Sequence, residues 1–140
     1  MGEKRSPRRL VKAIDTNVVL RWLMEDDPTQ TADAQSAFAQ PVWISLTVLI
    51  ETAWVLRSRY RFSAADAADL LSRVVEVQQV AVADPELVEW AIGRLRVGAD
   101  FADMAHLVAA RRMEAFVTFD RSIVKAAGLD GPLPVETLRG

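Results

Sequence analysis

Short apolar runs alternate along the chain with longer stretches in which hydrophobic residues recur at helical spacing. The apolar runs are bounded by polar or turn residues, which is typical of short buried strands. Strands that alternate with helices predict an α/β fold with a mostly parallel sheet. The expected strands lie at residues 11–14, 42–44, 79–83 and 116–119, with a last edge strand beginning at residue 135.

Capping signals indicate where the helices begin. Two Asp-Pro pairs, at residues 27–28 and 84–85, each place an N-cap residue before a proline at the first helical position. A serine or aspartate at positions 45, 63 and 100 precedes three further helices. The expected helices run over about residues 18–23, 28–38, 46–59, 64–75, 85–97, 101–112 and 122–127.

The composition is that of an ordinary globular domain, and it limits the possible metal chemistry. The 140 residues fit one domain, and 51% of them are hydrophobic and 26% charged. The chain has no cysteine and one histidine, which excludes disulfides, thiolate metal sites and histidine-rich zinc sites. A bound metal must then be held mainly by oxygen ligands, which favours Mg²⁺ or Mn²⁺.

The net charge of −2 hides a basic N-terminal segment. Residues 1–12 contain five basic residues and one acidic residue, so the remainder carries roughly −6. We expect residues 1–11 to form a basic arm outside a domain at residues 12–140, as a disordered solubilising tail or an RNA-binding arm. The sequence contains no apolar run as long as a membrane span and no signal-peptide core, so a cytoplasmic protein is expected.

Acidic residues stand where an α/β fold binds ligands, beyond the carboxyl ends of its strands. Asp15 and Asp120 each follow an expected strand, and Glu51 lies about two turns into the helix after the second strand. Asp100 and Asp103 open another helix, and their spacing places them on one face of it. Four separate segments thus carry acids towards one end of the predicted sheet.

Clustered carboxylates repel one another, and divalent cations relieve that repulsion. A pair of such ions can stabilise both the attacking and the leaving oxygen in phosphodiester hydrolysis, with no serine, cysteine or histidine nucleophile. Each acid taken singly also fits an ordinary cap or turn. Their joint placement favours a metal-dependent nuclease.

Four segments carrying these acids resemble the motifs of PIN-domain proteins, and they occur in the family's order. The resemblance extends over about residues 12–130. In length, and in the segment at residues 26–28, the chain is most similar to the VapC-type toxins of bacterial toxin–antitoxin pairs. The matching segments are residues 13–22 (AIDTNVVLRW), 42–56 (VWISLTVLIETAWVL), 98–103 (GADFAD) and 118–121 (TFDR).

The resemblance implies a three-layer α/β/α fold with a small, mostly parallel sheet of four to five strands. It implies a Mg²⁺- or Mn²⁺-dependent endoribonuclease that is inhibited by a cognate VapB-type antitoxin and forms a homodimer. The metal-binding and catalytic acids would be Asp15, Glu51, Asp103 and Asp120, with Asp100 as an auxiliary ligand or helix cap. By analogy, the residues that orient these acids or bound water are Thr16, Asn17, Ser45 and Thr118, for which ordinary caps and turns are the alternative.

An arginine, the single histidine and the tryptophans are further candidates for roles near these acids. Arg121, next to Asp120, is the best candidate for contacting an RNA phosphate. His106, one turn after Asp103, either reaches the site or packs elsewhere, and the four tryptophans are expected in the core or an interface.

Two other enzyme classes fit less well, and a non-catalytic role remains an alternative. A phosphatase of the haloacid dehalogenase type needs a second aspartate where this chain has Asn17, and also a catalytic lysine in the later segments. A receiver domain needs a lysine close after a late strand, whereas Lys125 follows Phe119 by six residues. The remaining alternative is a non-catalytic PIN-like module that binds RNA or DNA together with its antitoxin.

Overall fold

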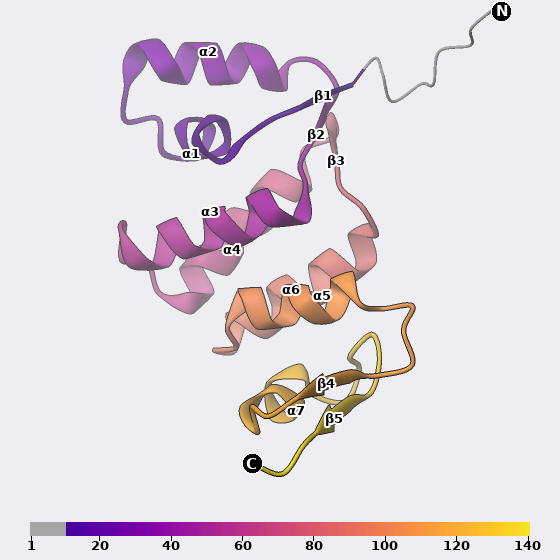
Figure 1. Ribbon diagram of the computed structural model, residues 1–140. Helices are drawn as coiled ribbons and strands as arrows, with labels where there is room; N and C mark the ends of the chain where they lie inside the picture. Colours follow the sequence, from indigo (N-terminus) through magenta and orange to yellow (C-terminus); the bar gives the residue numbers. More distant parts are fainter. Residues whose placement is uncertain (1–10) are drawn as a thin grey trace, which may run out of the picture.

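A computed structural model describes residues 11–140, so all but one residue of the predicted basic arm lies outside the described residues. These residues form seven helices and five short strands, in the alternating order that the hydrophobic pattern predicts (Figure 1). The strands are β1 (Lys12–Ala13), β2 (Val42–Trp43), β3 (Val80–Ala81), β4 (Phe116–Thr118) and β5 (Val135–Thr137). The helices are α1 (Thr16–Met24), α2 (Pro28–Phe38), α3 (Leu46–Ser58), α4 (Ala64–Val75), α5 (Pro85–Arg96), α6 (Phe101–Ala109) and α7 (Ser122–Ala127).

All strand pairs are parallel, as predicted, but the strands are divided between two sheets. β1, β2 and β3 pair in that order, and β4 pairs with β5. The division arises because α6 contacts α3 on one side and α7 on the other, so β4 and β5 lie beyond α6 (Figure 1). The α/β class is confirmed, while the expectation of one sheet of four to five strands is wrong.

The helices stack in successive pairs and enclose the core. α1 packs on α2, α3 on α4, and α5 on both α4 and α6, with α7 and the second sheet at the far end of the stack (Figure 1). Leu49 and Leu56 of α3, Leu71 of α4, Ile92 of α5 and Met104 of α6 are all buried to 1% exposure or less. Burial of such side chains stabilises the fold by about 1.5–3 kcal/mol each, which fixes α3 and α6 relative to each other.

The predicted caps form at four of five positions. Asp27, Ser45, Ser63 and Asp100 each accept a hydrogen bond from the backbone N–H three residues on. Asp84 is the exception, because its backbone is left-handed (φ 48°) and its carboxylate pairs with Arg111 instead. The Asp-Pro pair at residues 84–85 therefore marks the start of α5 through its proline alone.

Two of the four tryptophans lie at the surface, so of the two places expected for them, core or interface, the core is wrong for these two. Trp43 is 40% and Trp54 59% exposed, whereas Trp22 is half-buried and stacks on Phe38 with ring centroids 4.8 Å apart. In residues 11–140, helices long and apolar enough to cross a membrane are absent.

Candidate active site

Glu51 is held in place by a residue of another predicted motif. The buried Thr16, the first residue of α1, donates its hydroxyl to Oε1 of Glu51 at 2.6 Å. The Glu51 carboxylate points towards α1, and the residue remains exposed to solvent. This hydrogen bond joins α1 to α3 across 35 residues of sequence, and it is a contact of the kind that the resemblance predicts for Thr16.

Asp15 stands at the start of α1, after β1, and caps the helix. Its Oδ1 accepts the backbone N–H of Val18 at 3.2 Å, as an N-cap residue does. Asp15 and Asn17 line a cavity of about 440 Å³ between α1 and α2, together with Arg21 and Asp33. Asn17 thus lies beside Asp15 at this cavity.

Asp100 and Asp103 lie on the first turn of α6. Asp100 is the N-cap and accepts the backbone N–H of Asp103 at 3.0 Å. Partial burial raises the pKa of Asp103 above its usual value, and the charges of Asp100 and Asp120 raise it further. His106, one turn along the helix, lowers the pKa of Asp103. The third and fourth motifs therefore place three carboxylates within electrostatic range of one another.

Asp120 follows β4 and is held by residues on both sides of it. Thr118 accepts the backbone N–H of Asp120 at 2.9 Å through its hydroxyl oxygen. Ser122 donates both its hydroxyl, at 2.6 Å, and its backbone N–H, at 2.9 Å, to Oδ1 of Asp120. These two hydrogen bonds lower the pKa of Asp120, whereas burial and neighbouring charges raise that of Asp103.

The five acids (Asp15, Glu51, Asp100, Asp103 and Asp120) do not meet at one sheet edge, because β1 and β4 belong to different sheets. Within residues 11–140, no three acidic or histidine side chains lie close enough together to hold one metal ion. The donor chemistry itself fits Mg²⁺ or Mn²⁺, since all five are carboxylates and cysteine is absent. The five acids thus offer suitable ligand types, but the described part of the chain does not bring three of them together at one point.

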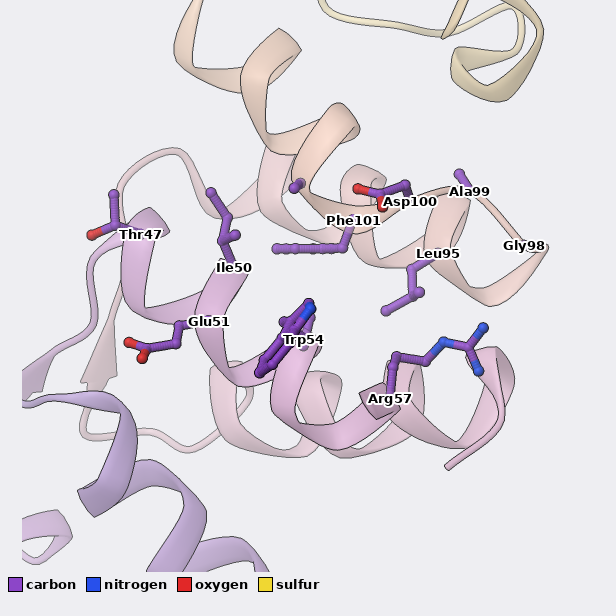
Figure 2. Close-up of a pocket in the computed structure, with 12 residues that line it drawn as sticks. Thr47, Ile50, Glu51, Trp54, Arg57, Leu95, Gly98, Ala99, Asp100 and Phe101 are labelled. Atoms are coloured by element: carbon purple, nitrogen blue, oxygen red, sulfur yellow. The ribbon is translucent and has the colours of Figure 1, made fainter. Parts of the chain in front are cut away.

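Two of the five acids border one cavity of about 500 Å³ between α3 and the start of α6 (Figure 2). Glu51 and Asp100 lie on opposite sides of it. Trp54 and Arg57 extend the α3 side beyond Glu51 at intervals of three residues, so each side chain neighbours the next along the helix. The sequence alone favours a core or interface position for Trp54 and a solvated or paired Arg57, and it does not predict that both line a cavity with Glu51.

The remaining candidates take simpler positions. Ser45 caps α3 and exchanges a hydrogen bond with the Thr47 hydroxyl at 2.9 Å, so its contacts are those of a cap. His106 is exposed and stacks on Phe116, with ring centroids 6.4 Å apart. Arg121 is exposed at the N-cap position of α7. Ser122 was not predicted, although a serine two residues after an aspartate favours a local turn that ties the two together.

Comparison with known proteins places the chain in a family. A family model described as the PIN domain matches residues 12–129, which is most of the chain. The chain therefore belongs to the PIN-domain family, and its fold is the three-layer α/β/α class that the four motifs implied. PIN domains are generally metal-dependent nucleases. Searches of the curated proteins and of the solved structures gave no match.

Proposed function

We propose that this chain is a divalent-metal-dependent endoribonuclease and the toxin of a VapC-type toxin–antitoxin pair. Membership of the PIN-domain family supports the nuclease part of the proposal. The length of the chain and its segment at residues 26–28 resemble those of VapC-type toxins, and this resemblance supports the toxin part of the proposal.

The observation that carries the nuclease proposal is how the five acids are held. Asp15, Glu51, Asp100 and Asp120 each accept hydrogen bonds through one carboxylate oxygen. Within residues 11–140, the second oxygen of each, and both oxygens of Asp103, have no hydrogen-bond partner. A carboxylate that is oriented through one oxygen and open at the other is suited to binding a cation.

In this proposal Asp15, Glu51, Asp103 and Asp120 would hold Mg²⁺ or Mn²⁺, with Asp100 as an auxiliary ligand. The ion, when bound, would supply Lewis acidity for hydrolysis of a phosphodiester. Thr16 and Thr118 fix Glu51 and Asp120 through the hydrogen bonds described above, and Ser122 keeps Asp120 ionised. Asn17 and Ser45 keep supporting places, beside Asp15 and at the start of α3.

The partners in this proposal are RNA, a VapB-type antitoxin and a second copy of the chain, all in the cytoplasm. Exposed side chains of Met113, Val117, Phe119 and Val124 support a protein partner, because they leave apolar surface around β4 and α7. Arg121 is exposed beside Asp120, so it is available to an RNA phosphate.

The test exploits the fact that asparagine caps a helix about as well as aspartate but carries no charge. We expect Asp15→Asn and Asp103→Asn each to abolish cleavage of cellular RNA and growth inhibition, with the fold retained. Asp27→Asn is the matched control, since Asp27 caps α2 in the same way and is not one of the five acids. Cleavage ends mapped after induction, with and without EDTA in the purified reaction, provide the measurement. Full activity of Asp15→Asn, or cleavage that persists in EDTA, contradicts the proposal.

A further inference from the structure

The cavity between α3 and α6 combines features that the proposed catalytic acids do not explain. We define the Trp54 cavity by four residues that line it: Trp54, Arg57, Leu95 and Phe101. Trp54 is 59% exposed, although an indole of this size gains free energy from burial. Phe101 is 4% and Leu95 3% exposed, so the cavity has a buried apolar wall opposite an accessible aromatic ring (Figure 2).

Arg57 adds a positive charge at one end of this cavity. Its Nη1 donates to the backbone carbonyl of Phe62 at 2.9 Å, which fixes the guanidinium while leaving its charge in place. Within residues 11–140, no carboxylate lies within ion-pair distance of Arg57. In Figure 2 the Arg57 side chain extends away from Glu51, along the side that carries Leu95 and Gly98. A fixed cation without an acidic partner suits an anionic group that arrives from outside.

The order of side chains along α3 completes the arrangement. Glu51, Trp54 and Arg57 follow one another at three-residue intervals, so each is displaced by about 4.5 Å along the helix axis from the one before. The order along this row of α3 is therefore an acid of the proposed cleavage site, an exposed aromatic ring and a cation. A nucleotide next to the scissile phosphate offers a flat base and a phosphate, which match the ring and the cation.

We propose that the Trp54 cavity is a nucleotide subsite for single-stranded RNA, in which Trp54 stacks on a base and Arg57 binds an adjacent phosphate. This inference rests on the proposed nuclease function, because it assigns the flanking contacts of that substrate. A cavity of about 500 Å³ is of the size that holds one small ligand group. An apolar protein segment would cover the ring but leave the charge of Arg57 unpaired, which makes RNA the better occupant.

Stacking on an aromatic ring tolerates any base, so the subsite selects unpaired RNA rather than a sequence. We expect Trp54→Ala to raise KM for a single-stranded RNA roughly 5- to 100-fold with kcat changed less than about twofold. Trp54→Phe should recover part of the loss. Arg57→Gln should weaken binding uniformly across sequences and reduce the slope of log Kd against log salt by about 0.7.

The decisive experiment measures binding and cleavage separately. Fluorescence anisotropy with a labelled single-stranded RNA of 12 nucleotides in EDTA reports binding, and cleavage of the same RNA in Mn²⁺ reports KM and kcat. A series of RNAs that each lack one base locates the contact. At one position, removing the base should weaken RNA binding by the wild type as much as the Trp54→Ala substitution does. Removing the same base should not weaken RNA binding by Trp54→Ala any further. Trp43→Ala is the matched control, because Trp43 is also exposed but lies on β2, away from the cavity.

Three outcomes would overturn the subsite. The first is equal binding and equal cleavage of RNA by the wild type and Trp54→Ala, which would show that the nuclease activity does not depend on this contact. The second is a loss of self-association in Trp54→Ala with RNA binding unchanged, which would make the cavity an interface between copies. The third is wild type that does not bind RNA. If the wild type binds RNA through Trp54 but cleaves none, the subsite stands and the proposed nuclease function fails.

Discussion

Removing the Thr16 hydroxyl tests whether one hydrogen bond holds Glu51 in place. In Thr16→Val the branched side chain keeps its shape in the buried position, but Glu51 Oε1 loses its 2.6 Å donor. A hydrogen bond to a charged group contributes about 1.5–3 kcal/mol. Because Glu51 is exposed and water can replace the hydroxyl, we expect the lower end, about 1.5 kcal/mol. For a domain of this size that corresponds to a Tm lower by about 5 °C.

The assay is thermal unfolding at pH 7, followed by circular dichroism, for a double-mutant cycle. Thr16→Val is compared in the wild type and in Glu51→Ala, where the acceptor is already absent. We expect the loss in the wild type to exceed the loss in Glu51→Ala by about 1 kcal/mol. Equal losses in the two backgrounds would contradict this prediction, because they would show that Thr16 stabilises α1 without acting through Glu51.

The same variant also links the hydrogen bond to activity. If Glu51 belongs to the proposed site, Thr16→Val should lower RNA cleavage about 10- to 100-fold, as loss of a residue that orients a metal ligand does. The fold should survive, so the loss of activity should be measurable well below Tm. Wild-type cleavage by Thr16→Val would separate Glu51 from the site.

Two further predictions concern stability. Desolvation and the charge of Glu76 raise the pKa of Glu89, so its ionised form costs folding free energy above the usual carboxyl pKa. Glu89→Gln should therefore stabilise the protein at pH 7 by less than about 1 kcal/mol. Urea titrations should show this gain in unfolding free energy shrinking towards zero as the pH falls to 4. A gain that does not depend on pH would contradict the prediction. Gly128 has φ +71° and ψ −157°, and an added Cβ would lie 3.0 Å from the Arg94 guanidinium, so Gly128→Ala should cost about 1–3 kcal/mol. The control is Gly93→Ala within α5, where an added Cβ has no atom within 4 Å, and this variant should stabilise the protein by up to about 1 kcal/mol. A gain in stability in both variants would contradict the strain expected at Gly128.

The helices could be predicted closely because their boundaries depend on local chemistry. α2 begins after Asp27 at Pro28 and α7 ends before Gly128, as the capping signals indicated. The pairing of strands is non-local, and strands of two or three residues leave little pattern to specify it. The two-sheet arrangement therefore could not be predicted from the sequence, and neither could the ion pair that prevents Asp84 from acting as a cap.

For the candidate site, the sequence identified residue types and local roles better than relative positions. Thr16 contacts the Glu51 carboxylate, whereas Thr118 contacts the backbone of Asp120, which is the ordinary turn contact given as the alternative for it. The exposure of Trp54 was not predictable, because an apolar residue among apolar neighbours normally indicates a core. Its position depends on where α6 crosses α3, which is set by packing between segments that are distant in sequence.

The separate second sheet has a consequence for how the protein responds to heat. β4, α7 and β5 join the helical stack where α7 meets α6, through the buried side chains of Ile123, Ala127 and Leu133, and where Arg94 Nε donates to the Ala126 carbonyl at 2.7 Å. We expect this C-terminal unit to open with a smaller free energy than the whole domain does, because elements at the end of a stack have neighbours on one side only. Asp120 moves with that unit, so its distance from Asp103 follows a local equilibrium rather than global stability. Warming should therefore separate these two carboxylates while the helical stack remains folded.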